Sequence, residues 1–169
     1  MTQVQKIIAS ALGAESLERG KRIYIKKKEN FGGISFDDKL CGAYGKVYID
    51  SEVFSVPDGI FIDLCGVLRN DAGSMEVAEY FKKSLKRENF SGMTVEIGGD
   101  SMSYLTMDDR FAVVKAMNEL SAVPFCTVFE CDYITAEYTL ENLLEKPAAF
   151  FNSGPQNYER IIRIDLGLV

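Results

Sequence analysis

One uninterrupted apolar segment constrains the fold of this chain more than any other feature. Residues 59–68 read GIFIDLCGVL, with Asp63 as the only charged side chain among them. A strand that is apolar on both faces must be covered on both faces, so it belongs in the centre of a sheet. The chain has 169 residues, a length that can bury one sizeable core. We therefore predict a single domain, residues 1–169, built around a central strand at this segment.

Helices and further strands are indicated on both sides of this segment. Thr2 followed by Gln5 forms a capping box, which predicts a helix that ends near Gly13. Caps and apolar spacing predict helices from Ser74 and from Thr106, and a short helix around residues 140–146. Alternating apolar and polar side chains predict strands within residues 22–28, 46–49, 53–56, 93–97, 103–107, 125–134 and 161–169.

The order of these elements predicts the fold class. From residue 59 onward the order is strand, helix, strand, glycine turn, strand, helix, strand, which is the βαββαβ order of a ferredoxin-like unit. Residues 46–68 are predicted to form a meander that leads into this unit. We predict the α/β (α+β) class, with a mixed, largely antiparallel sheet of about five to seven strands and three main helices. The N-terminal helix and a glycine-rich loop over residues 29–45 are predicted as embellishments.

The absence of histidine excludes several kinds of active site. The chain has no histidine, so it cannot supply a Ser-His-Asp triad, a Cys-His nucleophile or a histidine-ligated zinc site. The four cysteines, Cys41, Cys65, Cys126 and Cys131, show no CxxC spacing, and we interpret them as small, mostly buried side chains of a reduced compartment. No apolar stretch approaches the roughly 20 residues that span a bilayer. We expect synthesis in a cytoplasm and no membrane partner.

Charge is distributed unevenly along the chain. Residues 1–30 carry seven basic and three acidic side chains, and the remaining residues carry twelve basic and twenty-two acidic ones. A basic segment on an acidic body argues against extensive nucleic-acid binding, and leaves only a local contact through residues 21–28. The same polarity favours docking onto an acidic protein surface, including that of a second copy of the chain.

Two short segments resemble the palm domain of nucleotidyl cyclases. FIDLCGV (61–67) resembles its first strand, and IGGDSM (97–102) resembles the hairpin that carries its second acidic residue. The resemblance implies that Asp63 and Asp100 bind Mg²⁺ and bridge it to a nucleotide triphosphate, with Gly66, Gly98 and Gly99 allowing close approach of phosphate. The alternative interpretation is structural: Asp63 ends a strand and Asp100 caps a tight turn.

The layout of the whole chain resembles a second kind of protein. A capped N-terminal helix, a basic strand, a long glycine-rich excursion and a C-terminal strand loosely resemble small phage head–tail joining and tail-terminator proteins. That resemblance implies a non-enzymatic subunit of a homo-oligomer, without a cofactor, incorporated in a virion after synthesis. We favour this assembly function, and keep a Mg²⁺-dependent nucleotidyl-transfer palm as the alternative.

Two groups of residues are candidates for partner binding. Arg22, Tyr24 and Lys26 share one face of a predicted strand, and Lys27 and Lys28 extend its positive charge. These lysines could also be a solvated edge that prevents aggregation. Phe150 and Phe151 stand before the loop 152–155, where an interface anchor would lie. Packing of this aromatic pair onto the sheet is the alternative.

Overall fold

The computed structural model describes residues 1–24, 29–31, 47–49, 53–143 and 157–169. Its strands are β1 (Arg22–Tyr24), β2 (Glu29–Phe31), β3 (Val47–Ile49), β4 (Val53–Ser55), β5 (Asp58–Cys65), β6 (Met93–Gly98), β7 (Cys126–Phe129) and β8 (Arg160–Asp165). Its α-helices are α1 (Gln3–Leu12), α2 (Ser74–Leu85), α3 (Met107–Met117) and α4 (Tyr133–Leu143), and Met102–Tyr104 and Leu166–Leu168 form short 3₁₀ helices.

The main sheet has four strands in the order β7-β6-β5-β8, and all of its pairs are parallel. The predicted α/β class and the central position of the 59–68 segment are therefore confirmed. The prediction of a largely antiparallel sheet is wrong, because a helix lies between each pair of consecutive strands from β5 to β8 and returns the chain to the same end of the sheet. Apolar strands of this kind are typical of parallel sheets covered on both faces.

The ferredoxin-like unit is absent because no hairpin follows β6. The chain leaves β6 at Gly98 and enters a 3₁₀ helix at Met102, so that residues 103–107 do not form the predicted return strand. The Ser101 N–H donates to the Leu64 carbonyl at 3.3 Å, which holds the turn against the end of β5. The chain then passes directly into α3, whose cap at Thr106 is confirmed.

Two further predictions need correction. The segments of residues 46–68 do not form a meander, because β3 pairs with β2, β4 pairs with β1, and β5 joins the main sheet. The strand predicted over residues 125–134 ends at Phe129, and a fourth helix begins at Tyr133, earlier than the predicted short helix. The Asp132 carboxylate causes this change by accepting a hydrogen bond from the Thr135 N–H at 3.0 Å, as an N-cap does.

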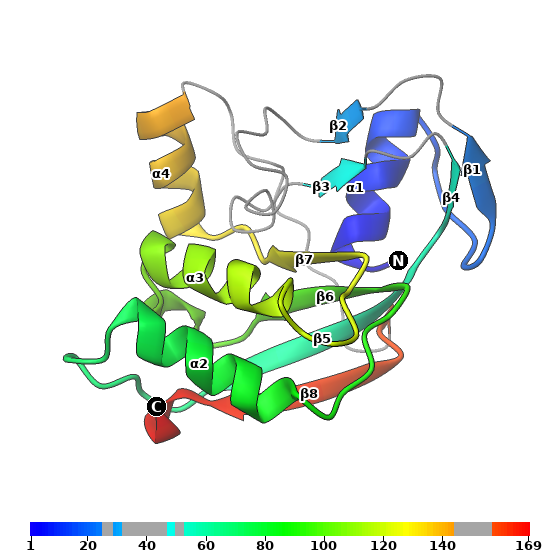
Figure 1. Ribbon diagram of the computed structural model, residues 1–169. Coiled ribbons are helices and arrows are strands. Elements are labelled where there is room, and N and C mark those ends of the chain that lie inside the picture. The colour runs from blue at the N-terminus through cyan, green and yellow to red at the C-terminus, as the bar shows by residue number, and fades with distance from the viewer. Residues whose placement is uncertain (25–28, 32–46, 50–52, 144–156) are drawn as a thin grey trace.

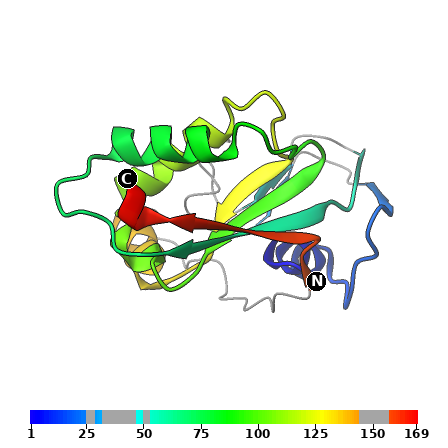
Figure 2. The ribbon, with the colours of Figure 1, turned by 90° about the horizontal axis from the view of Figure 1, so that it is seen from below.

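Helices cover both faces of the sheet. In Figure 2, α2 and α3 lie on one side of the strands and α1 lies on the other. Ile60, Ile62 and Leu64 of β5 belong to the core beneath α2 and α3, where Phe81 of α2 is fully buried. A second, smaller core lies under α1 and includes Ile8, Phe54 and Val128. No helix among the described residues is long and apolar enough to span a bilayer.

Candidate functional site

The carboxyl ends of the parallel strands are the first place to look for a site. In open parallel sheets, ligands bind beyond these ends, at the point where the order of the strands in the sheet reverses. Here that point lies between β5 and β8. Asp63 lies next to the end of β5, opposite Gly98 of β6 in the strand register. Asp100 is exposed in the turn after β6.

The structure brings Asp63 and Asp100 to the same end of the sheet, in surroundings unlike those that the palm resemblance implies. Asp63 Oδ2 lies 3.9 Å from Nε of Arg163 on β8, and both side chains are substantially exposed. Asp100 lies on a turn before a 3₁₀ helix, where the resemblance requires a hairpin. Among the described residues, no group of three or more Asp, Glu, Cys or His comes together as a metal site. The turn at Asp100 and the arginine beside Asp63 differ from the surroundings that the palm resemblance implies for a Mg²⁺ centre.

The glycines of this region make room for carboxylates of the protein itself. A Cβ on Gly98 would collide with the Glu130 carboxylate, and a Cβ on Gly66 would collide with that of Asp165. A Cβ on Gly99, whose φ is +105°, would lie 2.6 Å from Asp63 Oδ1. The space that the resemblance assigned to phosphate therefore faces negative charge. Such surroundings repel a nucleotide in the absence of a cation.

Glu130 and Asp132 add further carboxylates just after β7. Partial burial raises the pKa of Glu130, and the hydrogen bond from the Gly99 N–H offsets part of this rise. The nearby negative charges of Glu96, Asp132 and Asp63 raise the pKa further. Partial burial would also raise the pKa of Asp132, but the hydrogen bonds from Arg110 and Thr135 and the charge of Arg110 together outweigh it and hold the pKa below its usual value. The two carboxyl groups differ because only Asp132 has a cation beside it.

Arg110 links α3 to the start of α4. Its side chain is fully buried, and its two terminal nitrogens donate to Asp132 at 2.7 and 2.8 Å. It also donates to the Thr135 hydroxyl at 2.7 Å, and its guanidinium lies 5.5 Å from the centre of the Phe129 ring. The guanidinium is thus saturated by internal partners. We interpret this cluster as structural rather than as a ligand site.

A second buried carboxylate, Glu96, holds α1 onto the sheet. It accepts hydrogen bonds from the backbone N–H groups of Gln3 at 2.9 Å and Val4 at 2.8 Å, and from the Tyr158 hydroxyl. Burial raises the pKa of Glu96, and these hydrogen bonds offset part of the rise. Sequence reasoning missed Glu96, Glu130, Asp132 and Arg110. A lone charged residue within an apolar strand, as Glu96 is in MTVEI, was the available signal.

The predicted binding residues Arg22 and Tyr24 lie on a small ribbon formed by β1 and β4, which projects at the edge of the molecule (Figure 1). Arg22 faces Ser55 and Tyr24 faces Val53 across the ribbon. All four side chains are exposed, with Tyr24 at 72% and Val53 at 45%. The candidates Lys26, Lys27, Lys28, Phe150 and Phe151 lie outside the described residues.

The opposite face of the ribbon anchors it to the body. Ile23 and Phe54, paired in register, pack on the core under α1. The Phe54 ring lies 5.9 Å from the Phe125 ring, centre to centre. Two backbone hydrogen bonds, from Gly20 N–H to Val56 and from Val56 N–H to Lys21, extend the pairing beyond the strands. The outer face is therefore presented on a fixed support.

Comparisons with known proteins leave the family of this chain open. No protein-family model matches it. A curated protein, the 3-isopropylmalate dehydratase large subunit of Campylobacter fetus subsp. fetus (strain 82-40), is 34% identical over 73 residues, which cover 43% of this chain and 17% of that protein. The chain thus spans less than a fifth of the length of this relative. A match of that extent assigns neither a family nor an activity.

Proposed function

We propose that the protein is a non-enzymatic assembly subunit that binds a second copy of itself through the outer face of the β1–β4 ribbon. The observation that carries this proposal is the pairing of exposed apolar and cationic side chains on a ribbon whose other face is anchored. Tyrosine and arginine are the side chains that most often dominate the binding energy of protein interfaces. A prepositioned ribbon also loses little conformational freedom on binding.

Charge supports a second copy as the partner. The outer face of the ribbon carries Arg22, beside Lys21, whereas the chain outside residues 1–30 has a large excess of acidic side chains. A basic patch and a separate acidic surface on each copy suit a head-to-tail contact, which produces rings when the rotation closes. The finer form of the proposal, a ring subunit of a phage particle, rests on the chain layout described above.

Replacing Arg22 with Glu and Tyr24 with Ser tests this function. We expect wild-type protein to self-associate with rising concentration in sedimentation velocity, and the R22E/Y24S variant to associate at least about tenfold more weakly, because the change removes an anchor and reverses a charge. R163E/Y104S is the matched control, since Arg163 and Tyr104 are exposed and lie outside the ribbon. A wild-type chain that stays monomeric at every concentration would refute the proposal. Closed rings in electron micrographs would support its finer form.

A further inference from the structure

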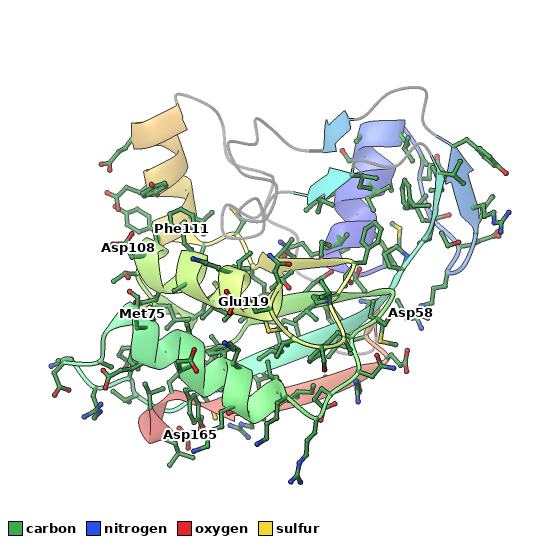
Figure 3. All side chains as sticks on the ribbon, in the orientation of Figure 1. Asp58, Met75, Asp108, Phe111, Glu119 and Asp165 are labelled. Carbon is green, nitrogen blue, oxygen red and sulfur yellow. The ribbon has the colours of Figure 1, made fainter. Side chains whose placement is uncertain are left out.

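The outer surface between α2 and α3 forms a groove with a volume of about 610 Å³. Its apolar lining includes Tyr80 of α2 and Leu120, which follows α3, and its rim includes Lys83 and Lys86. In Figure 3, the labelled Glu119 marks the α3 side of this groove, and Met75 marks the start of α2. The groove thus combines an apolar floor with a lysine rim.

The groove is positively charged. Among the described residues, four lysines and two glutamates line it and its continuation between the two helices: Lys82, Lys83, Lys86, Lys115, Glu79 and Glu119. Lys82 contacts both glutamates, with Nζ 3.1 Å from Glu119 and 3.3 Å from Glu79. In the described part of the chain, no ion pair neutralises Lys83 or Lys86. The surface therefore favours an acidic partner.

Helix α4 carries a complementary stripe. Tyr133, Glu137 and Glu141 are each four residues apart, so they lie along one side of the helix. All three are exposed, and Tyr133 has 74% of its surface accessible. The Tyr133 hydroxyl donates to Glu137 at 3.1 Å, which orders the aromatic ring beside the carboxylate. The inner side of α4 packs on the core through Ile134 and Tyr138.

The two surfaces match in chemistry and in the order of their side chains. Tyr80 precedes Lys83 by three residues and Lys86 by six, and Tyr133 precedes Glu137 by four and Glu141 by eight. At a rise of about 1.5 Å per residue, Lys86 lies roughly 9 Å along the helix direction from Tyr80, and Glu141 lies roughly 12 Å along α4 from Tyr133. The flexible four-carbon stems of the lysines take up this difference of about 3 Å, so that the carboxylates can meet ammonium groups when the two helices lie side by side with their rings in contact. Helix-in-groove docking of this kind is a common mode of recognition.

We infer that the α4 stripe of one copy docks into the α2–α3 groove of the next copy. Within one molecule, α3 lies between α2 and α4 (Figure 1), so that a copy does not fill its own groove. The contact uses two different surfaces and is therefore head-to-tail, which allows a ring or a chain of subunits. This inference rests on the proposed self-association and adds a second contact, separate from the ribbon.

Paired charge reversals test the inference in the full-length chain. We expect K83E/K86E, in the groove, and E137K/E141K, in the stripe, each to weaken self-association at least about tenfold, since like charges then face each other. The fourfold variant carrying both pairs keeps the net charge of the wild type and is expected to recover association. D71K/D100K is the control, because it changes the net charge as E137K/E141K does, at two exposed positions away from both surfaces.

Mixing the two double variants gives a sharper readout. The mixture allows two complementary junctions: the acidic stripe of K83E/K86E meets the basic groove of E137K/E141K, and the basic stripe of E137K/E141K meets the acidic groove of K83E/K86E. We expect equimolar mixtures to associate at least about tenfold more tightly than either variant alone in sedimentation equilibrium, and salt to weaken this mixed association by screening. Wild-type association that survives both reversals, or a mixture that associates no more tightly than either variant alone, would overturn this inference and leave the proposed function standing. A monomeric wild type would refute the proposed function itself.

Discussion

At the residue scale, Glu96 shows how one buried carboxylate can organise a helix. The carboxylate lies at the N-terminal end of α1 and accepts from the N–H groups of Gln3 and Val4, which have no partner within the helix. The positive end of the helix dipole favours a negative charge at this position. Burial opposes the charge and raises the pKa of Glu96. The stability of the protein should therefore depend on the protonation of this residue.

The pH dependence of Glu96 has a definite sign. Its pKa is higher in the folded protein than the ordinary value of 4.5, so the folded state binds the proton more tightly than the unfolded state does. The free energy of unfolding of the wild type should fall relative to E96Q as pH rises above 4.5, by up to about 1.4 kcal/mol per pH unit, until the folded pKa is passed. Urea unfolding of both proteins from pH 4 to 8 measures the difference. A difference that does not change with pH would contradict this prediction.

Gly98 and Glu130 form a second residue-scale pair. A Cβ at position 98 would collide with the Glu130 carboxylate. We expect G98A to lower the free energy of unfolding by about 1–3 kcal/mol, through displacement of that carboxylate. In an E130A background the same substitution should cost less, because the colliding group is gone. Urea unfolding of the four proteins of this double-mutant cycle tests the pair. Equal costs in both backgrounds would show that the Glu130 side chain is not the cause.

At the element scale, the Arg110–Asp132 contact joins two helices. Arg110 lies on α3 and is fully buried, and Asp132 caps the start of α4. The ring of Phe111 on α3 also lies 5.7 Å from that of Tyr138 on α4, centre to centre. The position of α4, and with it the stripe that we propose as a docking surface, therefore depends on this junction.

The two partners of this ion pair should be energetically coupled. D132N leaves the buried Arg110 charge without a carboxylate, and we expect it to lower the free energy of unfolding by about 3 kcal/mol. R110M/D132N should lose less than the sum of the two single variants. The pKa of Asp132 is lowered in the folded protein, so its stabilising contribution should be complete above pH 3.8 and should be lost as pH falls from there through the lower pKa of the folded state. Thermal and urea unfolding measure each effect, and additive losses would argue against coupling.

At the scale of the whole molecule, local signals predicted the elements better than their arrangement. The Thr2 and Thr106 capping boxes, the interior face of α2 and the central strand at residues 59–68 were readable from the sequence. Each depends on interactions within a few residues. Whether two strands pair in parallel or antiparallel depends instead on where the intervening chain returns, and the SYLTM segment has the alternation of a strand although it turns into α3.

In the candidate sites too, features that depend on neighbouring residues could be predicted, and features that depend on distant segments could not. The exposed position of Arg22 and Tyr24 could be predicted, because alternation along one strand determines which side chains face outward. Their neighbour Val53 could not, because the pairing of β1 with β4 joins segments about thirty residues apart. The palm resemblance at Asp63 and Asp100 rested on short segments alone. It did not include the carboxylates of Glu130 and Asp165, which reach the same glycines from distant strands.

The position of β8 has a consequence for how the molecule forms. The central strand β5 pairs on one side with β6, its near neighbour in sequence, and on the other with β8, where Ile60 lies beside Arg160, one hundred residues further along. The closure of such a long loop is slow and entropically unfavourable. The strands β5, β6 and β7 can therefore assemble earlier, with one backbone edge of β5 still able to pair with another chain. During that interval the chain is most vulnerable to aggregation, and the arrival of β8 ends it.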